Sequence, residues 1–409
     1  MTRLPHSAVT RRTVVGASIA GGALAATTGL APEAGAAYPA IRKPTPPDRF
    51  VDFGSNAEMR WDSVDPRRYL TGQGRLFVRN HTATPTIDRS TWRLRVFGDG
   101  LATPRTAGEA LSLTWRDLRR MPRTTVLSVH ECTGNGRSFY GTQQGKAAAG
   151  TAWTLGAVGT VLWEGVRLRD VLKAVGLSEE AVSIQATGLD SEYVTGGVNY
   201  GSIRRPFPVY KALKDAVLAW GANGADLLPD HGYPVRLVLP GWVGIGSIKW
   251  LGSLEVSRSE LYSPWNTKWY RMTGPTYSAT EPPLTVNPVR SAWELPLGAT
   301  LPAGRSRTLT GRAWSGAAPI RKVDVSLDGG ASWQRADLVD EDGHGAGVST
   351  VRGHGWSRFS VEWRHPRRGA HVLLARATDA QGRRQPLESP YNDNGYFFDA
   401  VVKHPITVS

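Results

Sequence analysis

The sequence predicts an α+β chain, with a mixed α/β domain followed by an all-β sandwich. From residue 77 to about residue 259, short apolar runs alternate with segments of helical periodicity, as in mixed α/β domains. After about residue 281 the pattern changes to short strands separated by turns, which predicts a sandwich of about a hundred residues. We place the two domains at residues 71–280 and 281–409, with the boundary in the proline-containing segment 275–288.

The first 37 residues have the features of a twin-arginine export signal. Arg11 and Arg12 open a low-charge stretch rich in alanine and glycine, and small residues follow at 34–37. Two ordinary arginines before a buried helix are the alternative, but the glycine content and the terminal position favour a signal. We therefore expect a protein exported to the periplasm or the extracellular space, often a sign of a cofactor inserted before transport. The proline-containing residues 38–70 predict an extended leader.

The charge of the chain is strongly positive. It has 49 basic and 35 acidic residues, a net charge of +14, and removing residues 1–37 takes away three arginines and one glutamate, which leaves +12. Such a charge attracts nucleic acid, acidic lipid or small anions. The arginines are scattered rather than clustered, so we do not expect a nucleic-acid partner. No later apolar run approaches the roughly 20 residues of a membrane span, so we expect no stable one.

Local patterns predict the individual elements of the two domains. Residues 91–97 alternate apolar and polar side chains, which predicts a strand, and residues 113–118 predict a helix capped near Ser112. Residues 211–220 fit a short helix or a strand, whereas residues 235–239 predict a strand. In the second domain, strands are predicted at residues 307–314, 322–327, 356–363 and 372–377, with a turn at 328–330.

Cys132 is the single cysteine of the chain, so it cannot form an internal disulfide. It could be a small buried apolar residue, an intermolecular bridge, a nucleophile or a metal ligand. Val126 and Leu127 predict a strand before it, and Gly134 and Gly136 after it allow the backbone to approach a ligand closely. This setting favours a thiolate presented at the end of a strand, and so metal or cofactor chemistry.

Four segments and the terminal β region carry a family resemblance. The segments are Phe77-Val78-Arg79-Asn80-His81, Cys132-Thr133-Gly134-Asn135-Gly136-Arg137, His231-Gly232-Tyr233-Pro234-Val235-Arg236 and Gly246-Ser247-Ile248-Lys249-Trp250-Leu251-Gly252. In this order they resemble the active-site and pterin-binding segments of the sulfite oxidase family of molybdopterin enzymes, over nearly the whole chain after the signal. The terminal region resembles that family's immunoglobulin-like dimerisation domain, which implies a homodimer.

The resemblance implies a molybdenum–molybdopterin cofactor and assigns residues to it. Cys132 is the implied molybdenum ligand, beside two sulfur ligands from the pterin. The donors implied for the pterin ring and its phosphate are Asn80, His81, His231, Arg236, Ser247 and Lys249. Considered alone, Arg236 would be interpreted as a residue on the exposed face of a strand. His81 alone would be interpreted as a residue of a solvated loop. Their order along the chain favours the cofactor.

The resemblance also implies an enzyme that oxidises sulfite to sulfate by oxygen-atom transfer. Arg79 is the implied anion-binding residue, since a guanidinium binds oxyanions through two hydrogen bonds, and Arg137 is a further candidate. Trp265-Asn266-Thr267-Lys268-Trp269-Tyr270-Arg271 resembles the family's later active-site loop, and Tyr270 is implied there beside the reacting oxygen. Thr133 and Gly136 differ from the alanine and arginine expected in the animal enzymes, which leaves the affinity for anions open.

The chain has no Cys-x-x-Cys-His motif and no segment resembling a cytochrome b5 domain, so we expect no haem in it. Electrons should therefore pass to a separate protein, such as an exported cytochrome c. One alternative keeps the cofactor and reduces another oxyanion or a sulfoxide. A more distant alternative is a non-enzymatic exported binding protein.

Overall fold

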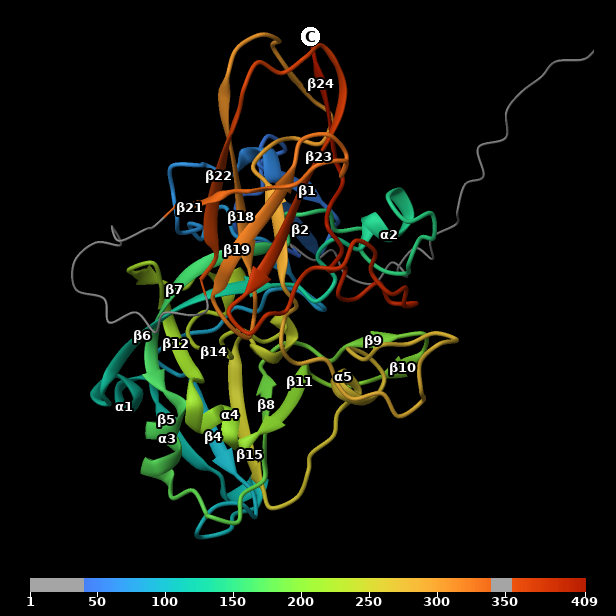
Figure 1. Ribbon diagram of the computed structural model, residues 1–409. Helices are drawn as coiled ribbons and strands as arrows, with labels where there is room; N and C mark the ends of the chain where they lie inside the picture. The colour runs from blue at the N-terminus through green and yellow to red at the C-terminus, as the bar shows by residue number, and fades with distance from the viewer. Residues whose placement is uncertain (1–39, 340–354) are drawn as a thin grey trace, which may run out of the picture. The chain divides into compact units, whose positions relative to one another are not determined.

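The computed structural model describes residues 40–339 and 355–409 of the 409-residue chain (Figure 1). The expected export signal lies outside the described residues. Within them, the elements belong to one compact unit. No helix in this part of the chain is long and apolar enough to cross a membrane.

Two five-stranded sheets form the centre of the first domain. One has the order β11 (Arg204–Pro208), β8 (Ser183–Gly188), β15 (Leu251–Ser257), β4 (Arg93–Phe97) and β5 (Leu111–Thr114), with only β15 and β4 parallel. The other has β13 (Ala225–Asp226), β12 (Val217–Ala222), β7 (Val158–Arg167) and β6 (Arg123–Glu131) in order, and β14 (Arg236–Val238) also pairs with β12. Their apolar side chains form the buried core of the domain.

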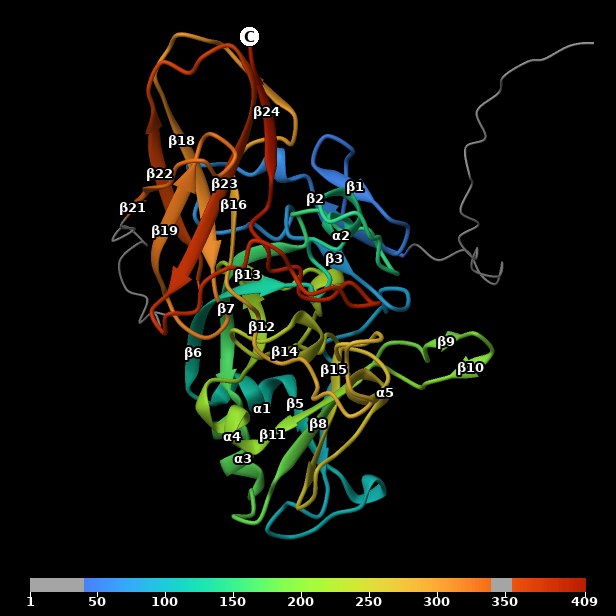
Figure 2. The same cartoon turned by 45° about the vertical axis from the view of Figure 1, so that its right-hand side comes forward.

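Short elements complete this domain. The helices are α1 (Trp115–Arg120), α2 (Ser138–Thr142), α3 (Leu168–Val175), α4 (Val209–Lys214) and α5 (Pro264–Thr267). β9 (Val194–Thr195) and β10 (Val198–Asn199) form a hairpin that lies beside α5 in both views (Figures 1 and 2). Tyr193 and Tyr200, which flank the hairpin, both contact the ring of Trp269, which follows α5.

Residues 38–70 are not only an extended leader. β1 (Phe50–Asp52) pairs with β2 (Asn56–Met59), and β2 pairs with β3 (Val78–Arg79), which carries a predicted site residue. Met59 is buried in an apolar cluster with Val158 of the first domain and Trp314 of the second, so this segment packs against both. The first domain therefore includes residues from before position 71.

The second domain consists of two facing sheets. One has the order β16 (Arg290–Trp293), β18 (Arg307–Trp314), β22 (Ser357–Trp363) and β21 (Asp337–Val339). The other has β17 (Ala299–Leu301), β24 (His404–Val408), β23 (Gly369–Asp379), β19 (Ile320–Ser326) and β20 (Gln334–Arg335). Trp293 and Phe359 of the first sheet share one apolar cluster with Val323 and Leu373 of the second, as in a sandwich.

The elements that the local patterns predicted are present in the structure, with two differences. The predicted helix at 113–118 begins at Trp115 because Thr114, not Ser112, caps it: the Thr114 hydroxyl accepts from the Asp117 backbone N–H at 3.2 Å. The segment 211–220 is a helix and then a strand, since α4 ends at Lys214 and β12 begins at Val217.

Candidate functional site

The Cys132 turn begins where β6 ends. The Cys132 backbone N–H donates to the carbonyl of Ala157 at 2.9 Å, so the thiol follows the paired end of β6 and β7. The Asn135 N–H closes the turn on the Cys132 carbonyl at 2.9 Å. A Cβ at Gly134 would lie 2.4 Å from the Arg137 guanidinium, so glycine is required for the arginine to fold back beside the thiol.

Cys132 lies where two cavities meet, and both are lined by predicted site residues. All seven residues assigned to the cofactor line the first cavity: Asn80, His81, Cys132, His231, Arg236, Ser247 and Lys249. All four residues assigned to catalysis line the second: Arg79, Cys132, Arg137 and Tyr270. Arg79, His81, Cys132 and Tyr270 line both. The structure therefore brings together residues from positions 79 to 270 around one thiol.

The first cavity contains buried cationic groups without a carboxylate bonded to them. The Arg236 guanidinium donates to the carbonyls of His231 and Ser247 at 3.0 and 2.9 Å, and burial lowers its pKa to about 9. Lys249 donates to the side chain of Asn80 and to the Asp230 carbonyl, and burial lowers its pKa to about 7. The charges of Asp190 and Asp230, which line the same cavity, oppose the fall in the pKa of Lys249, but neither carboxylate is bonded to a cation there. A buried charge without a bonded partner is costly, so this cavity favours an anionic ligand.

The histidines around this cavity provide neutral hydrogen-bonding groups. Burial lowers the pKa values of His81, His130 and His231 well below the ordinary value, with nearby cations adding to the effect. The Thr133 hydroxyl, which also lines the cavity, is buried and has no hydrogen-bond partner among the described residues. Cations, neutral imidazoles and an unpaired hydroxyl fit a phosphate-bearing pterin, and a thiol fits its molybdenum.

We expect Lys249 to make the stability of the cofactor-free protein depend on pH. Its pKa is about 7 in the folded chain and near the ordinary 10.5 when unfolded, so the unfolded chain binds more protons between these values. The free energy of unfolding contributed by Lys249 therefore rises with pH in this interval. Urea unfolding at pH 7.5 and 9.5 should show a smaller rise for Lys249→Met than for the wild type. Lys173→Met, an exposed control on α3, should keep the wild-type rise, and an unchanged rise in Lys249→Met would contradict the prediction.

The second cavity has two guanidinium groups close to the thiol. The Arg137 Nε and Nη1 donate to the carbonyls of Asn394 and Thr151, both at 2.8 Å, and the Arg79 Nη1 donates to the Asn80 carbonyl at 2.5 Å. Neither arginine is ion-paired with a carboxylate in the described part of the chain. Burial raises the pKa of the Cys132 thiol, and the charges of Arg79 and Arg137 oppose this rise. The cavity is therefore suited to an anion beside the thiol.

Tyr270 is held rigidly beside these groups. Its ring stacks on Tyr396 with centroids 5.2 Å apart, and its hydroxyl lies 3.3 Å from His81 Nε2. Its φ of 57° is unusual for a residue other than glycine and requires support from the surrounding packing. Burial raises the pKa of its hydroxyl, which therefore stays protonated and can donate a hydrogen bond.

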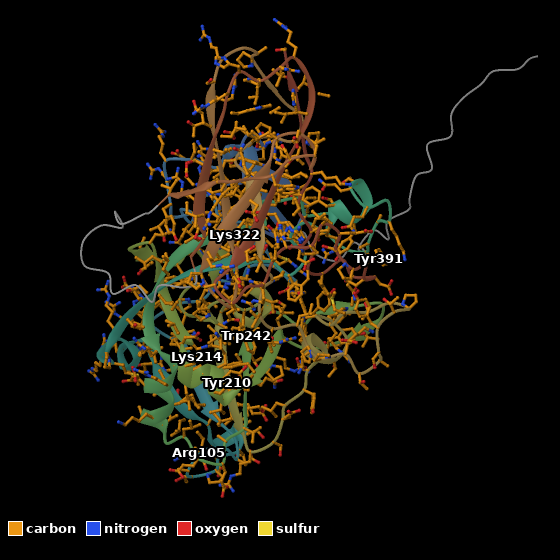
Figure 3. All side chains as sticks on the ribbon, viewed as in Figure 1. Arg105, Tyr210, Lys214, Trp242, Lys322 and Tyr391 are labelled. Atoms are coloured by element: carbon orange, nitrogen blue, oxygen red, sulfur yellow. The ribbon has the colours of Figure 1, made fainter. Side chains whose placement is uncertain are left out.

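The second domain, for which the resemblance implies a role in dimerisation, also contributes to the site. Asn394 and Tyr396 line the second cavity, and they lie in the segment after Tyr391, which is marked in Figure 3. The Phe397 backbone N–H donates to the Thr133 carbonyl at 3.0 Å, in the cysteine turn itself. Residues that follow β23 thus form one wall of the second cavity.

A buried network ties the strand before Cys132 to the second domain. Glu131 accepts from Arg290 at 2.6 Å, from Trp314 Nε1 at 2.9 Å and from Asn135 Nδ2 at 2.9 Å. The side chains of Glu131 and Arg290 are 2% and 4% exposed, so the ion pair is fully desolvated. The residue before the thiol is therefore fixed by β16 and β18.

Gly136 does not face either cavity. Its φ is +84°, and a Cβ there would lie 2.6 Å from Arg290 and 3.2 Å from Phe398. The side-chain position therefore points toward the second domain. The arginine expected at this position in the animal enzymes is replaced by Gly136 here, and this replacement does not remove a group from the wall of either cavity.

Several cavity residues were not predicted from the sequence. They are His130, Asp190 and Asp230 in the first cavity, and Trp153, Tyr193, Asn394 and Tyr396 in the second. The alternation of a strand could have identified His130, which lies two residues before Cys132. No local pattern marks Tyr396, because its place depends on how the two domains pack.

Known proteins share this architecture. The family model described as "Oxidoreductase molybdopterin binding domain" matches residues 81–265, and "Mo-co oxidoreductase dimerisation domain" matches residues 292–407. Sulfite oxidase of Gallus gallus is 35% identical over 334 residues, covering 76% of this chain and 70% of that protein. Mitochondrial sulfite oxidase of Homo sapiens is 38% identical over 287 residues, covering 67% of this chain and 50% of the human protein.

A solved structure agrees with these relatives. The sulfane dehydrogenase SoxCD of Paracoccus pantotrophus has a TM-score of 0.71 at 27% identity, covering 87% of each chain. The chain spans about half the length of the mammalian sulfite oxidases that it matches. The ordered motifs, the lone thiol between two cavities and these matches have one explanation: the chain belongs to the sulfite oxidase family of molybdopterin-dependent oxidoreductases.

Proposed function

We propose that this protein oxidises sulfite to sulfate and passes the electrons to a separate acceptor. The observation that carries the proposal is the pair of guanidinium groups without carboxylate partners, Arg79 and Arg137, in the cavity that begins at the Cys132 thiol. Relatives named sulfite oxidase and a structural neighbour named sulfane dehydrogenase support oxidation of a sulfur substrate.

Each residue has a role set by its position. Arg79 and Arg137 bind the anion and orient its sulfur toward the thiol end of the cavity. The neutral Tyr270 hydroxyl donates a hydrogen bond there, and Cys132 holds the metal as a thiolate. Asn80, His81, His231, Arg236, Ser247 and Lys249 hold the pterin and its phosphate in the first cavity. When bound, the molybdenum–molybdopterin group supplies the transferable oxygen and accepts two electrons.

The direction of the reaction is tested by steady-state assays of the purified holoenzyme. Oxidation of sulfite with ferricyanide as acceptor, and no reduction of nitrate or sulfoxides with a reduced dye, is the expected result. Reduction of either compound without sulfite oxidation would replace the proposal by the reductase alternative. Absence of molybdenum after expression in a host that makes the cofactor would favour the binding-protein alternative.

Arg79→Gln should lower kcat/KM for sulfite by roughly one to two decades. A charge-assisted hydrogen bond contributes about 1.5–3 kcal/mol, and about 1.4 kcal/mol is one decade in rate. Arg169→Gln, at a half-exposed pair with Asp170, is the matched control and should leave kcat/KM unchanged. An unchanged kcat/KM in Arg79→Gln would move this residue out of the substrate site.

The proposal also includes the cellular location of the protein and its electron acceptor. The protein is exported through the twin-arginine pathway, and a cytochrome c outside the cytoplasm takes its electrons. Replacing Arg11 and Arg12 together by lysine should retain the folded precursor in the cytoplasm, because the export machinery reads the arginine pair as an address. Equal amounts of exported protein in cell fractions would show another route.

The proposed assembly is a homodimer formed through the second domain, whose family model is named for dimerisation. Light scattering on the full-length chain should give twice the protomer mass at micromolar concentration, and a monomer would refute the dimer. A chain ending near Pro282 is not a clean test of the interface. It lacks Arg290 and Tyr396, which support Glu131 and the second cavity.

A further inference from the structure

The second cavity is larger than sulfite needs. Its volume is about 300 Å³. Sulfite has four heavy atoms, and with about 30 Å³ for each, the share of a water molecule in the liquid, they fill less than half of that space. The lining includes half-buried and exposed residues as well as buried ones, so the cavity is open to solvent on one side.

The groups that line this cavity are of two kinds. Arg79 and Arg137 lie near the buried thiol. The aromatic lining consists of the half-buried rings of Tyr193 and Trp269 and the buried ring of Trp153, besides Tyr270 and Tyr396. The described residues that line the cavity include no carboxylate. The cavity therefore suits a molecule with an anionic group at one end and an apolar body at the other, and disfavours a cationic amine.

The aromatic wall is held in place by its neighbours. The ring centroid of Trp269 lies 5.8 Å from that of Tyr193, 4.8 Å from that of Tyr200 and 5.9 Å from that of Trp265. Trp265 belongs to α5, and Tyr193 and Tyr200 flank the β9–β10 hairpin, so Trp269 links the helix to both ends of the hairpin. The helix and the hairpin lie together in Figure 2. Rings fixed in this way offer apolar contact while losing little side-chain entropy on binding.

We infer that the enzyme also oxidises organic sulfinates, in which an apolar group replaces one oxygen of sulfite; this inference rests on the proposed function. The sulfinate group lies between Arg79 and Arg137, and the organic group lies against Trp269 and Tyr193. The reaction is R–SO₂⁻ + H₂O → R–SO₃⁻ + 2 H⁺ + 2 e⁻. A sulfur–oxygen bond forms, both O–H bonds of water break, the protons go to solvent, and the acceptor, ferricyanide in the assay, takes the electrons.

The test compares benzenesulfinate, methanesulfinate and sulfite as substrates of the holoenzyme with ferricyanide. Benzenesulfinate should be oxidised with a KM about tenfold below that of methanesulfinate, since a ring contact contributes on the order of a tenfold gain in affinity. In Trp269→Ala, the ratio of kcat/KM for benzenesulfinate to that for sulfite should fall about tenfold. Tyr210→Ala is the control, because Tyr210 is 65% exposed on α4, lines neither cavity and is marked in Figure 3.

Binding gives a second readout that needs no turnover. Benzenesulfonate, the expected product, should bind to wild-type protein more tightly than sulfate in calorimetry, and Trp269→Ala should remove this preference. Tyr193→Leu provides the same test if Trp269→Ala does not fold. Sulfite oxidation without benzenesulfinate turnover or benzenesulfonate binding would overturn this inference and leave the proposed function standing. Oxidation of neither compound by molybdenum-loaded protein would overturn the proposed function itself.

Discussion

Cys132→Ser should abolish sulfite oxidation while leaving the fold largely intact. The hydroxyl of serine is not deprotonated as a thiol is, so the variant loses the one thiolate ligand that the chain offers. Replacing groups that only support metal ligands costs about 10–100-fold in activity, so loss of the ligand itself should cost more than about a hundredfold. The pterin contacts in the first cavity remain, and they can still hold the cofactor.

The measurement is the rate of sulfite oxidation together with the molybdenum content of the same sample. Ser138→Ala is the matched control, since Ser138 lies in the same segment, lines neither cavity and has no hydrogen-bond partner for its hydroxyl among the described residues. The control should retain full activity and metal. A Cys132→Ser enzyme with bound molybdenum and a rate within tenfold of the wild type would exclude Cys132 as ligand.

Arg290→Met should lower the free energy of unfolding by about 3–5 kcal/mol, the usual cost of removing one partner from a buried ion pair. Glu131 would keep its bonds from Trp314 and Asn135 but would lose its counter-charge in a fully buried position. The oxidation rate should fall as well, because Glu131 precedes the thiol directly. Urea unfolding of the cofactor-free protein measures the change in the free energy of unfolding. The kcat for sulfite in the holoenzyme measures the change in the oxidation rate.

Two further variants make this prediction specific. Arg364→Met removes a pair of similar length, 2.9 Å, whose side chains are 78% and 52% exposed, and should cost at most about 1 kcal/mol. Glu131→Gln combined with Arg290→Met should recover part of the loss, because the unpaired charge is then gone. A cost below about 1 kcal/mol for Arg290→Met would show that the network does not stabilise the turn.

Local sequence patterns predicted the features that depend on near neighbours. Strand alternation located β4 and β18, and the glycines after Cys132 correctly indicated a close backbone approach. The first turn of α1 was placed wrongly because two polar residues compete as the cap and the structure uses Thr114. Such choices depend on a single hydrogen bond, which a pattern does not resolve.

The rest of the site could not be predicted because it depends on packing between distant segments. Arg290 and Glu131 are 159 residues apart in the chain, and each alone fits an ordinary charged position. Tyr396 follows a long β region in which nothing resembles an active-site segment. The motifs were informative because several of them occur in the order that the family shows. Arg290, Glu131 and Tyr396 belong to no such ordered set, so each alone carries no signal.

Residues of both domains form the site, so its parts are synthesised at different times. A ribosome makes the chain from its N-terminus, so the cysteine turn is synthesised long before Arg290, Trp314 and Tyr396. Until these residues have emerged and folded, Glu131 lacks its partners and the second cavity lacks a wall. A nascent chain halted before β16 therefore has every predicted molybdopterin-binding side chain but lacks one wall of the second cavity. The proposed substrate cavity is accordingly completed only after the segment that contains Asn394 and Tyr396 has been made.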